Sequence, residues 1–160
     1  MKKTLILSFA LLLNCILLFS QNSEYYKGRG YQGYAFNKDF FVFMSIENQK
    51  ERYTPTKQDI KLCEEILKRD IDELISSLNL CTSISKNTLR KYRRQYVGFV
   101  NKDGDIIIWI NMLYKRSNHR TKAELSNDII DVLDGGEDYW NIYVNVTKKY
   151  LYKLQINGIA

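Results

Sequence analysis

The chain has 160 residues and a formal net charge of +6, from 24 Lys and Arg, 18 Asp and Glu, and one neutral His. This mild positive excess fits weak attraction to an anionic surface, and it is not the signature of a nucleic-acid-binding protein. The lone His119 excludes a site built from several histidines, and the length is that of a single domain with its own core.

The first twenty residues have the layout of a secretory signal peptide. Lys2 and Lys3 form a basic start, Leu5 to Phe19 are almost all apolar, and Ser20 supplies a small residue for cleavage. The apolar run is shorter than the ~20 residues that a helix needs to cross a bilayer, so we expect no permanent transmembrane helix after cleavage. With residues 1–20 as signal peptide, we expect an exported protein that is periplasmic, outer-membrane-associated or secreted.

The cysteines raise two alternatives. Cys15 would be acylated if Leu12 to Cys15 served as a lipobox, but Asn14 is larger than the usual small residue there, and removal of the whole segment explains the sequence better. Cys63 and Cys81 lie near the two ends of a predicted helix, about 25 Å apart if that helix is continuous, which is beyond disulfide reach. We interpret them as two buried free thiols.

Residues 21–39 interleave glycines and tyrosines without a helical or strand period, so we expect a flexible lead-in before a single domain at 40–160. Gly28 to Gly33 match the G-x-G-x-x-G pattern, but we expect no strand before it and no helix after it, so we predict no dinucleotide cofactor. The run from Phe40 to Ile46 is β-prone and is predicted to form a short strand.

A long amphipathic helix is predicted to begin after Thr56, which forms a capping-box-like pair with Asp59. Apolar residues then recur at steps of three and four, as expected of a helix with one buried face. This apolar stripe contains Ile60, Cys63, Ile66, Leu67, Ile71, Leu74, Ile75 and Leu78. We place Lys61, Glu64, Glu65, Lys68, Arg69, Asp72 and Glu73 on the solvated side.

The second half of the chain alternates apolar and polar residues with a period of two. We predict strands at 92–100, 105–113, 139–146 and 150–157, a turn at 101–104, a basic loop at 114–122 and a short helix at 123–133. Such alternation is typical of an antiparallel sheet with one covered face. The fold class is therefore predicted to be α+β, with one long amphipathic helix packed on a four- to five-stranded antiparallel meander sheet.

The order of a strand, a long helix and four strands over residues 40–157 resembles the cystatin-like arrangement. Cystatins inhibit cysteine proteases through a Gln-x-Val-x-Gly hairpin. Here Gln95-Tyr96-Val97-Gly98 lacks the residue before glycine and lies within a strand, so the resemblance does not imply protease inhibition.

The chain is also similar to uncharacterised small secreted proteins of Bacteroidota. The residues that carry this resemblance are Phe19 to Asn22, Ile108 to Asn111, Asp134 to Gly136, Trp140-Asn141 and Asn157 to Ala160. The resemblance implies an envelope or secreted protein, and it implies no activity and no catalytic residues.

The chemistry-bearing motifs each have a simpler structural explanation. Asn101, Asp103 and Asp105 alternate like the start of a calcium loop, but Ile106 and Met112 stand where that loop needs glycine and a carboxylate. A Cys–His dyad would need His119 to meet a cysteine that we assign to the core. We therefore assign no catalytic residue, no cofactor and no metal ligand.

The candidate binding surface consists of basic residues on the first of two neighbouring predicted strands and in the loop that follows the second: Arg93, Arg94, Lys115, Arg116 and Arg120. The leading hypothesis is a non-catalytic binding protein of the cell envelope or secreted space, whose partner is an envelope protein or an anionic glycolipid and not a nucleic acid. One alternative is a small hydrolase acting on an envelope glycan through Glu137 and Asp138. Another is an inhibitor of an exported enzyme that uses the loop at 114–122.

Overall fold

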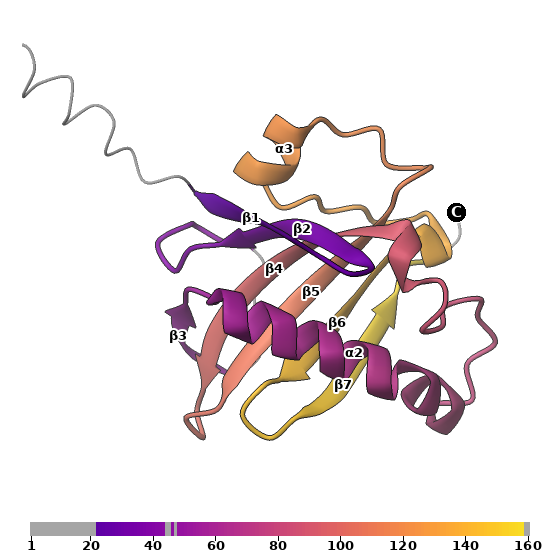
Figure 1. Ribbon diagram of the computed structural model, residues 1–160, viewed down its shortest axis with the longest axis horizontal. Helices are drawn as coiled ribbons and strands as arrows, with labels where there is room; N and C mark the ends of the chain where they lie inside the picture. The colour runs from indigo at the N-terminus through magenta and orange to yellow at the C-terminus, as the bar shows by residue number, and fades with distance from the viewer. Residues whose placement is uncertain (1–21, 44–45, 47, 159–160) are drawn as a thin grey trace, which may run out of the picture.

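The computed structural model describes residues 22–43, 46 and 48–158, and the predicted signal peptide with its alternative at Cys15 lies outside these residues. It shows an α+β fold in which the long helix α2 (Lys57–Ser77) lies across one face of a seven-stranded, mostly antiparallel mixed sheet (Figure 1). The strands are β1 (Ser23–Gly28), β2 (Tyr31–Phe36), β3 (Gln49–Tyr53), β4 (Tyr92–Asn101), β5 (Ile106–Tyr114), β6 (Tyr139–Asn145) and β7 (Tyr150–Ile156). The short elements are α3 (Lys122–Asn127) and the single turns η1 (Leu89–Lys91) and η2 (Gly136–Asp138).

Strands β4 to β7 form the predicted antiparallel meander, with the order β1-β2-β4-β5-β6-β7 across the sheet. The other edge of β4 is shared by two strands. Residues 33–36 of β2 pair in parallel with residues 94–97 of β4, and β3 pairs in antiparallel fashion with residues 98–101. The four- to five-stranded sheet that we predicted is therefore extended by β1, β2 and β3.

The prediction of a lead-in without strand structure is wrong, because β1 and β2 form an antiparallel hairpin at one edge of the sheet. Gly33 allows β2 to approach β4 closely: a Cβ at this position would lie 2.2 Å from the main-chain oxygen of Arg94. The strand predicted at 40–46 is also wrong, since residues 40–43 and 46 are irregular and the strand of this region is β3. The sheet thus begins at Ser23, well before residue 40.

The predicted N-terminus of the long helix is confirmed. The Thr56 hydroxyl accepts a hydrogen bond from the Asp59 amide at 3.2 Å, and the Asp59 carboxylate accepts one from the Thr56 amide at 2.9 Å. Most of the predicted apolar stripe is buried against the sheet, although Leu78 follows the last helical residue and is exposed. Glu64 is the exception on the polar side, because it is buried although we placed it in solvent.

The sheet face opposite α2 is covered as well, contrary to the prediction of one covered face. Phe36, Val97, Phe99, Ile107 and Trp109 pack there against Ile129, Phe40, Val42 and Ile46. The short helix ends at Asn127, earlier than predicted, because the chain becomes extended at Asp128. The carbonyls of Leu125 and Asp128 then accept hydrogen bonds from the buried amide of Gln95 at 3.0 and 2.7 Å.

Both cysteines that the structure describes are free thiols. Cys63 is buried as predicted, and burial raises the pKa of its thiol well above the ordinary value. Cys81 is exposed, so the prediction of a second buried thiol is wrong. Within the described residues, no helix has both the length and the apolar character needed to cross a membrane.

Candidate functional site

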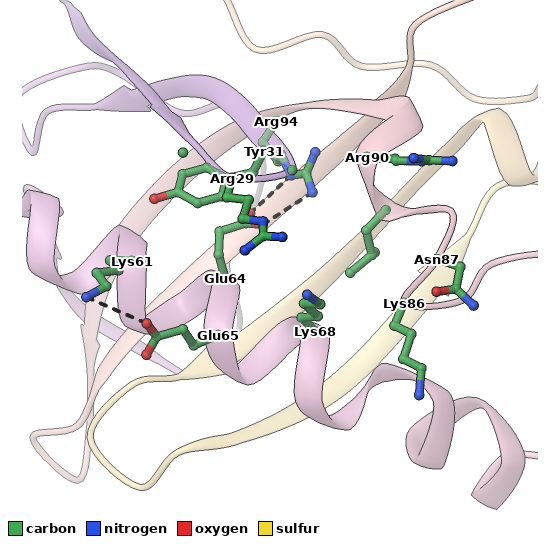
Figure 2. A pocket seen from close by; sticks show the side chains of 13 residues that line it. Arg29, Tyr31, Lys61, Glu64, Glu65, Lys68, Lys86, Asn87, Arg90 and Arg94 are labelled. Atoms are coloured by element: carbon green, nitrogen blue, oxygen red, sulfur yellow. Dashed lines mark hydrogen bonds and ion pairs between the residues drawn. The ribbon is translucent and has the colours of Figure 1, made fainter.

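A cleft of about 970 Å³ opens beside the N-terminal half of α2. Its walls come from the turn between β1 and β2, the helix itself, residues 86–90 and Arg94 of β4 (Figure 2). We call the following five residues the cationic rim: Arg29, Lys61, Lys68, Lys86 and Arg90. All five side chains are exposed, so this cleft is open to solvent on a positively charged border.

A buried ion pair lies among the residues that line the cleft. The Nε and Nη2 atoms of Arg94 donate to the two carboxylate oxygens of Glu64 at 3.0 and 3.2 Å. The Tyr96 hydroxyl donates to the same carboxylate at 2.9 Å, and Nη1 of Arg94 donates to the Tyr92 carbonyl at 2.7 Å. Arg94 is 1 % exposed and Glu64 is 7 % exposed, so the charge of each is balanced by the other within the protein.

The same burial determines the state of Tyr96. Desolvation, followed by the charge of Glu64, raises the pKa of this phenol well above its ordinary value. Tyr96 therefore stays protonated and remains a hydrogen-bond donor to Glu64. Together Glu64, Arg94 and Tyr96 connect α2 to β4. Because the buried charges of Glu64 and Arg94 cancel, the positive charge of the cleft comes from the cationic rim.

The cationic rim contains three side chains without an ion pair among the described residues: Arg29, Lys68 and Arg90. Lys61 has Glu65 at 3.8 Å, and Lys86 has Asp72 at 3.6 Å. Lys68 stands one helical turn after Glu64 on α2, whereas Arg29 lies between two glycines at the β1–β2 turn. Three separate elements therefore each place, on the border of one open cleft, a cation that has no ion pair among the described residues.

One wall of the cleft is aromatic and does not share the charge of the rim. Tyr31 packs over Gly28, where an added Cβ would lie 2.3 Å from the tyrosine ring. Desolvation, then the charges of Glu64 and Glu65, raises the pKa of Tyr31, so its phenol stays neutral. Leu89, which is 4 % exposed, contributes a further apolar group.

The predicted basic surface is not one patch in the structure. Arg94 is buried on the α2 side of β4, while Nη1 of Arg93 donates to the Arg120 carbonyl at 3.0 Å. The Lys115 ammonium donates to the Arg90 carbonyl at 2.5 Å, and burial, followed by Arg94 and Arg93, lowers its pKa. Arg116 is exposed, as predicted for a surface residue.

The cleft was not predicted from the sequence, although the sequence contains one signal of it. Lys61, Glu64, Glu65 and Lys68 recur at steps of three and four, which places them on one strip of the helix. Nothing in the local pattern shows that Arg29 and Arg90, which are about sixty residues apart, meet this strip.

The residues of the two alternative hypotheses hold loops in place. Glu137 accepts hydrogen bonds from the amide and hydroxyl of Ser83, the first at 2.9 Å, and Asp138 accepts one from the Ser117 hydroxyl. In the loop at 114–122, Asn118 is 3 % exposed, whereas residues 116, 117 and 119–122 are exposed. Neither carboxylate lines the cleft.

Across residues 22–43, 46 and 48–158, no group of three or more His, Cys, Asp or Glu side chains is arranged to hold a metal ion. Comparison of this chain with protein-family models, with curated proteins and with solved structures found no match.

Proposed function

We propose that this protein is an exported, non-catalytic binding protein that takes an anionic ligand into the cleft beside α2. The observation that carries the proposal is the set of three cations around one open cleft, Arg29, Lys68 and Arg90, that have no ion pair among the described residues. Converging cations attract anionic groups, and a low-dielectric wall beside them strengthens that attraction.

The buried pair of Glu64 and Arg94 supports this proposal because its charges serve the fold, whereas the charges of the rim remain available to a ligand. Glu64 and Arg94 neutralise one another within the protein, so they do not compete for the ligand or cancel the rim. A rigid connection between α2 and β4 also keeps Lys68 at a constant position relative to the sheet, which lowers the ordering cost of binding.

The binding part of the proposal is tested by calorimetry of the purified protein with inorganic tripolyphosphate, a small polyanion. The triple variant Arg29→Gln, Lys68→Gln and Arg90→Gln is expected to raise the dissociation constant by about tenfold, since three exposed charge pairs at roughly 0.5 kcal/mol each sum to about 1.5 kcal/mol. Raising the salt concentration is expected to weaken binding to the unmodified protein.

A matched triple variant distinguishes a site from general attraction. Lys38→Gln, Lys57→Gln and Arg116→Gln remove the same charge from exposed positions that do not line the cleft. We expect this control to change the dissociation constant less than about threefold. Equal weakening in both triple variants, or no binding to the unmodified protein, would contradict the proposed cleft.

Export rests on the layout of residues 1–20 and is tested separately. We expect mass spectrometry of the protein recovered from its native cells to find Gln21 as the first residue, in a periplasmic, envelope or medium fraction. An intact Met1 in the cytoplasmic fraction would contradict export, and an acylated Cys15 would contradict cleavage after Ser20.

A further inference from the structure

The cleft contains groups that a site for a simple anion does not need. Tyr31 presents an aromatic ring beside the unpaired cations, and Leu89 adds a second apolar group. The face of an aromatic ring is electron-rich and offers an inorganic anion no favourable contact, but it packs well against an apolar face of an organic ring. The ligand chemistry must therefore explain an aromatic wall as well as a cationic rim.

One acidic and one neutral polar side chain also line the cleft, and both indicate that the ligand carries hydroxyl groups. Glu65 is exposed, and its only ion pair among the described residues is the 3.8 Å contact with Lys61. Such a carboxylate repels a bare polyanion but accepts hydrogen bonds from hydroxyls. Asn87, whose amide both donates and accepts, is exposed on the opposite side, and Figure 2 shows the two residues on separate elements.

The size of the cleft agrees with a ligand larger than a phosphate ion. Its volume of about 970 Å³ is at the upper end of the range for small-molecule sites, roughly 300–1,000 Å³. A ligand with one anionic group and one hydroxylated ring would reach from the cations to Tyr31.

We propose that the ligand of this cleft is a phosphorylated saccharide. Its phosphate lies among Arg29, Lys68 and Arg90, and the C–H face of its sugar ring packs on Tyr31. The sugar hydroxyls donate to Glu65 and exchange hydrogen bonds with Asn87. This inference rests on the proposed function, because it names the chemistry of the anion that the same cleft binds.

The test compares three ligands by calorimetry: glucose 1,6-bisphosphate, hexane-1,6-diol bisphosphate and tripolyphosphate. The first two carry the same two phosphates, but only the first has a hydroxylated ring. We expect glucose 1,6-bisphosphate to bind about fivefold more tightly than the acyclic bisphosphate, the gain of a ring contact. Tyr31→Leu is expected to abolish this preference and to leave the affinity for the acyclic ligand unchanged.

Two controls make the result specific. Tyr150→Leu changes an exposed tyrosine of β7 that does not line the cleft, and it should leave the preference intact. Glu65→Ala should reduce the preference for glucose 1,6-bisphosphate over the acyclic bisphosphate, because a hydroxyl acceptor is lost for the sugar alone while the repulsive charge is lost for both ligands. Glu65 is exposed on the helix surface, so this variant remains informative if Tyr31→Leu fails to fold.

The outcomes separate the two proposals. Equal affinities for the cyclic and acyclic bisphosphates would overturn the saccharide and leave anion binding standing. Retained preference in both Tyr31→Leu and Glu65→Ala would overturn it as well. If none of the three ligands binds, the proposed function itself fails.

Free sugar phosphates and the headgroups of phosphorylated glycolipids share this chemistry. Flotation with phosphatidylcholine vesicles that contain a phosphorylated diglucosamine lipid distinguishes these sources. Vesicle binding that glucose 1,6-bisphosphate displaces supports the headgroup of a lipid as ligand. Binding of the soluble compound without vesicle binding supports a free saccharide.

Discussion

Arg93 and Arg94 are neighbours in sequence, yet they belong to two different basic regions. Because side chains alternate along a strand, Arg94 lies under α2 with Glu64, while Arg93 lies on the other side and bonds to the Arg120 carbonyl. The region around Arg93 satisfies its cations with protein acceptors, as Lys115 also shows. The cleft instead combines a neutralised buried pair with rim cations that have no ion-pair partner among the described residues.

The number of basic residues in a region is therefore a poor guide to a binding surface. A cation that already donates to a carbonyl or a carboxylate must lose that bond before it can bind a ligand. Arg29, Lys68 and Arg90 have no such bond within the part of the chain that the structure describes, so the contrast predicts which substitutions change stability and which change binding.

The largest expected effect comes from breaking the buried pair. Arg94→Met leaves the Glu64 carboxylate buried without its cation, and we expect the free energy of unfolding to fall by about 3–5 kcal/mol in urea denaturation. Glu65→Gln, an exposed change on the same helix, should stay within about 0.5 kcal/mol of the unmodified protein.

The double variant Glu64→Gln with Arg94→Met tests the cause. It removes both charges and keeps an acceptor for the Tyr96 hydroxyl, so it should recover at least half of the lost stability. A double variant no more stable than Arg94→Met alone would show that lost packing, and not the unpaired charge, causes the effect.

A smaller loss is expected on the opposite face from Gln95→Leu. The Gln95 side chain also accepts hydrogen bonds from the Ile130 amide at 2.9 Å and from the Asn111 side chain at 3.2 Å. Leaving these groups unsatisfied should cost about 3 kcal/mol and speed hydrogen exchange at Ile130. Gln155→Leu, on an exposed position of β7, is the matched control, and unchanged protection of Ile130 in Gln95→Leu would contradict the role of Gln95.

The comparison of the two basic regions is sharpened by Arg93→Ala and Arg90→Ala. Arg93→Ala removes a hydrogen bond to the Arg120 carbonyl and should lower the unfolding free energy by about 1 kcal/mol. Arg90→Ala removes an exposed side chain and keeps the main-chain carbonyl that binds Lys115, so a change below about 0.5 kcal/mol is expected. Thermal denaturation of both variants measures the difference in stability. A larger loss in Arg90→Ala than in Arg93→Ala would contradict the assignment of Arg93 to a bonded region and of Arg90 to an unbonded rim.

The smallest effect concerns pH at the start of α3. Hydrogen bonding from the Thr121 backbone, then from Arg120, lowers the pKa of Glu124 from 4.5 to about 2. Because the pKa is lower in the folded state, this stabilisation is complete above pH 4.5 and is lost as the pH falls toward 2. An NMR titration of the Glu124 carboxyl should follow this midpoint, and Arg120→Gln should move it upward; a midpoint near 4.5 in the unmodified protein would contradict the prediction.

The elements that could be predicted are those whose signals are local. Thr56 and Asp59 are three residues apart, and the apolar stripe of α2 repeats within each turn, so the helix is visible in its own residues. The meander from β4 to β7 follows equally from alternation within each strand.

The features that were missed depend on distant partners. Strand β2 needs β4 as its parallel neighbour, and the glycine that permits their contact looks like an ordinary loop residue in sequence. Glu64 stands among the charged residues of α2, and only Arg94 on another element makes its burial favourable. The cleft was not predictable for the same reason, because its cations come from three separate segments.

The parallel pairing of β2 with β4 has a consequence for the order in which the molecule folds. Phe36 pairs with Val97 across roughly sixty intervening residues. The β1–β2 hairpin therefore cannot dock on β4 until the chain has been synthesised beyond Val97. Helix α2 and the β4–β5 hairpin rely on nearby residues and can form earlier. The β1–β2 turn, which carries Arg29 and Tyr31, should therefore be the last part of the cleft to form. A ligand that contacts this turn should slow the undocking of the β1–β2 hairpin more than the opening of any other part of the sheet.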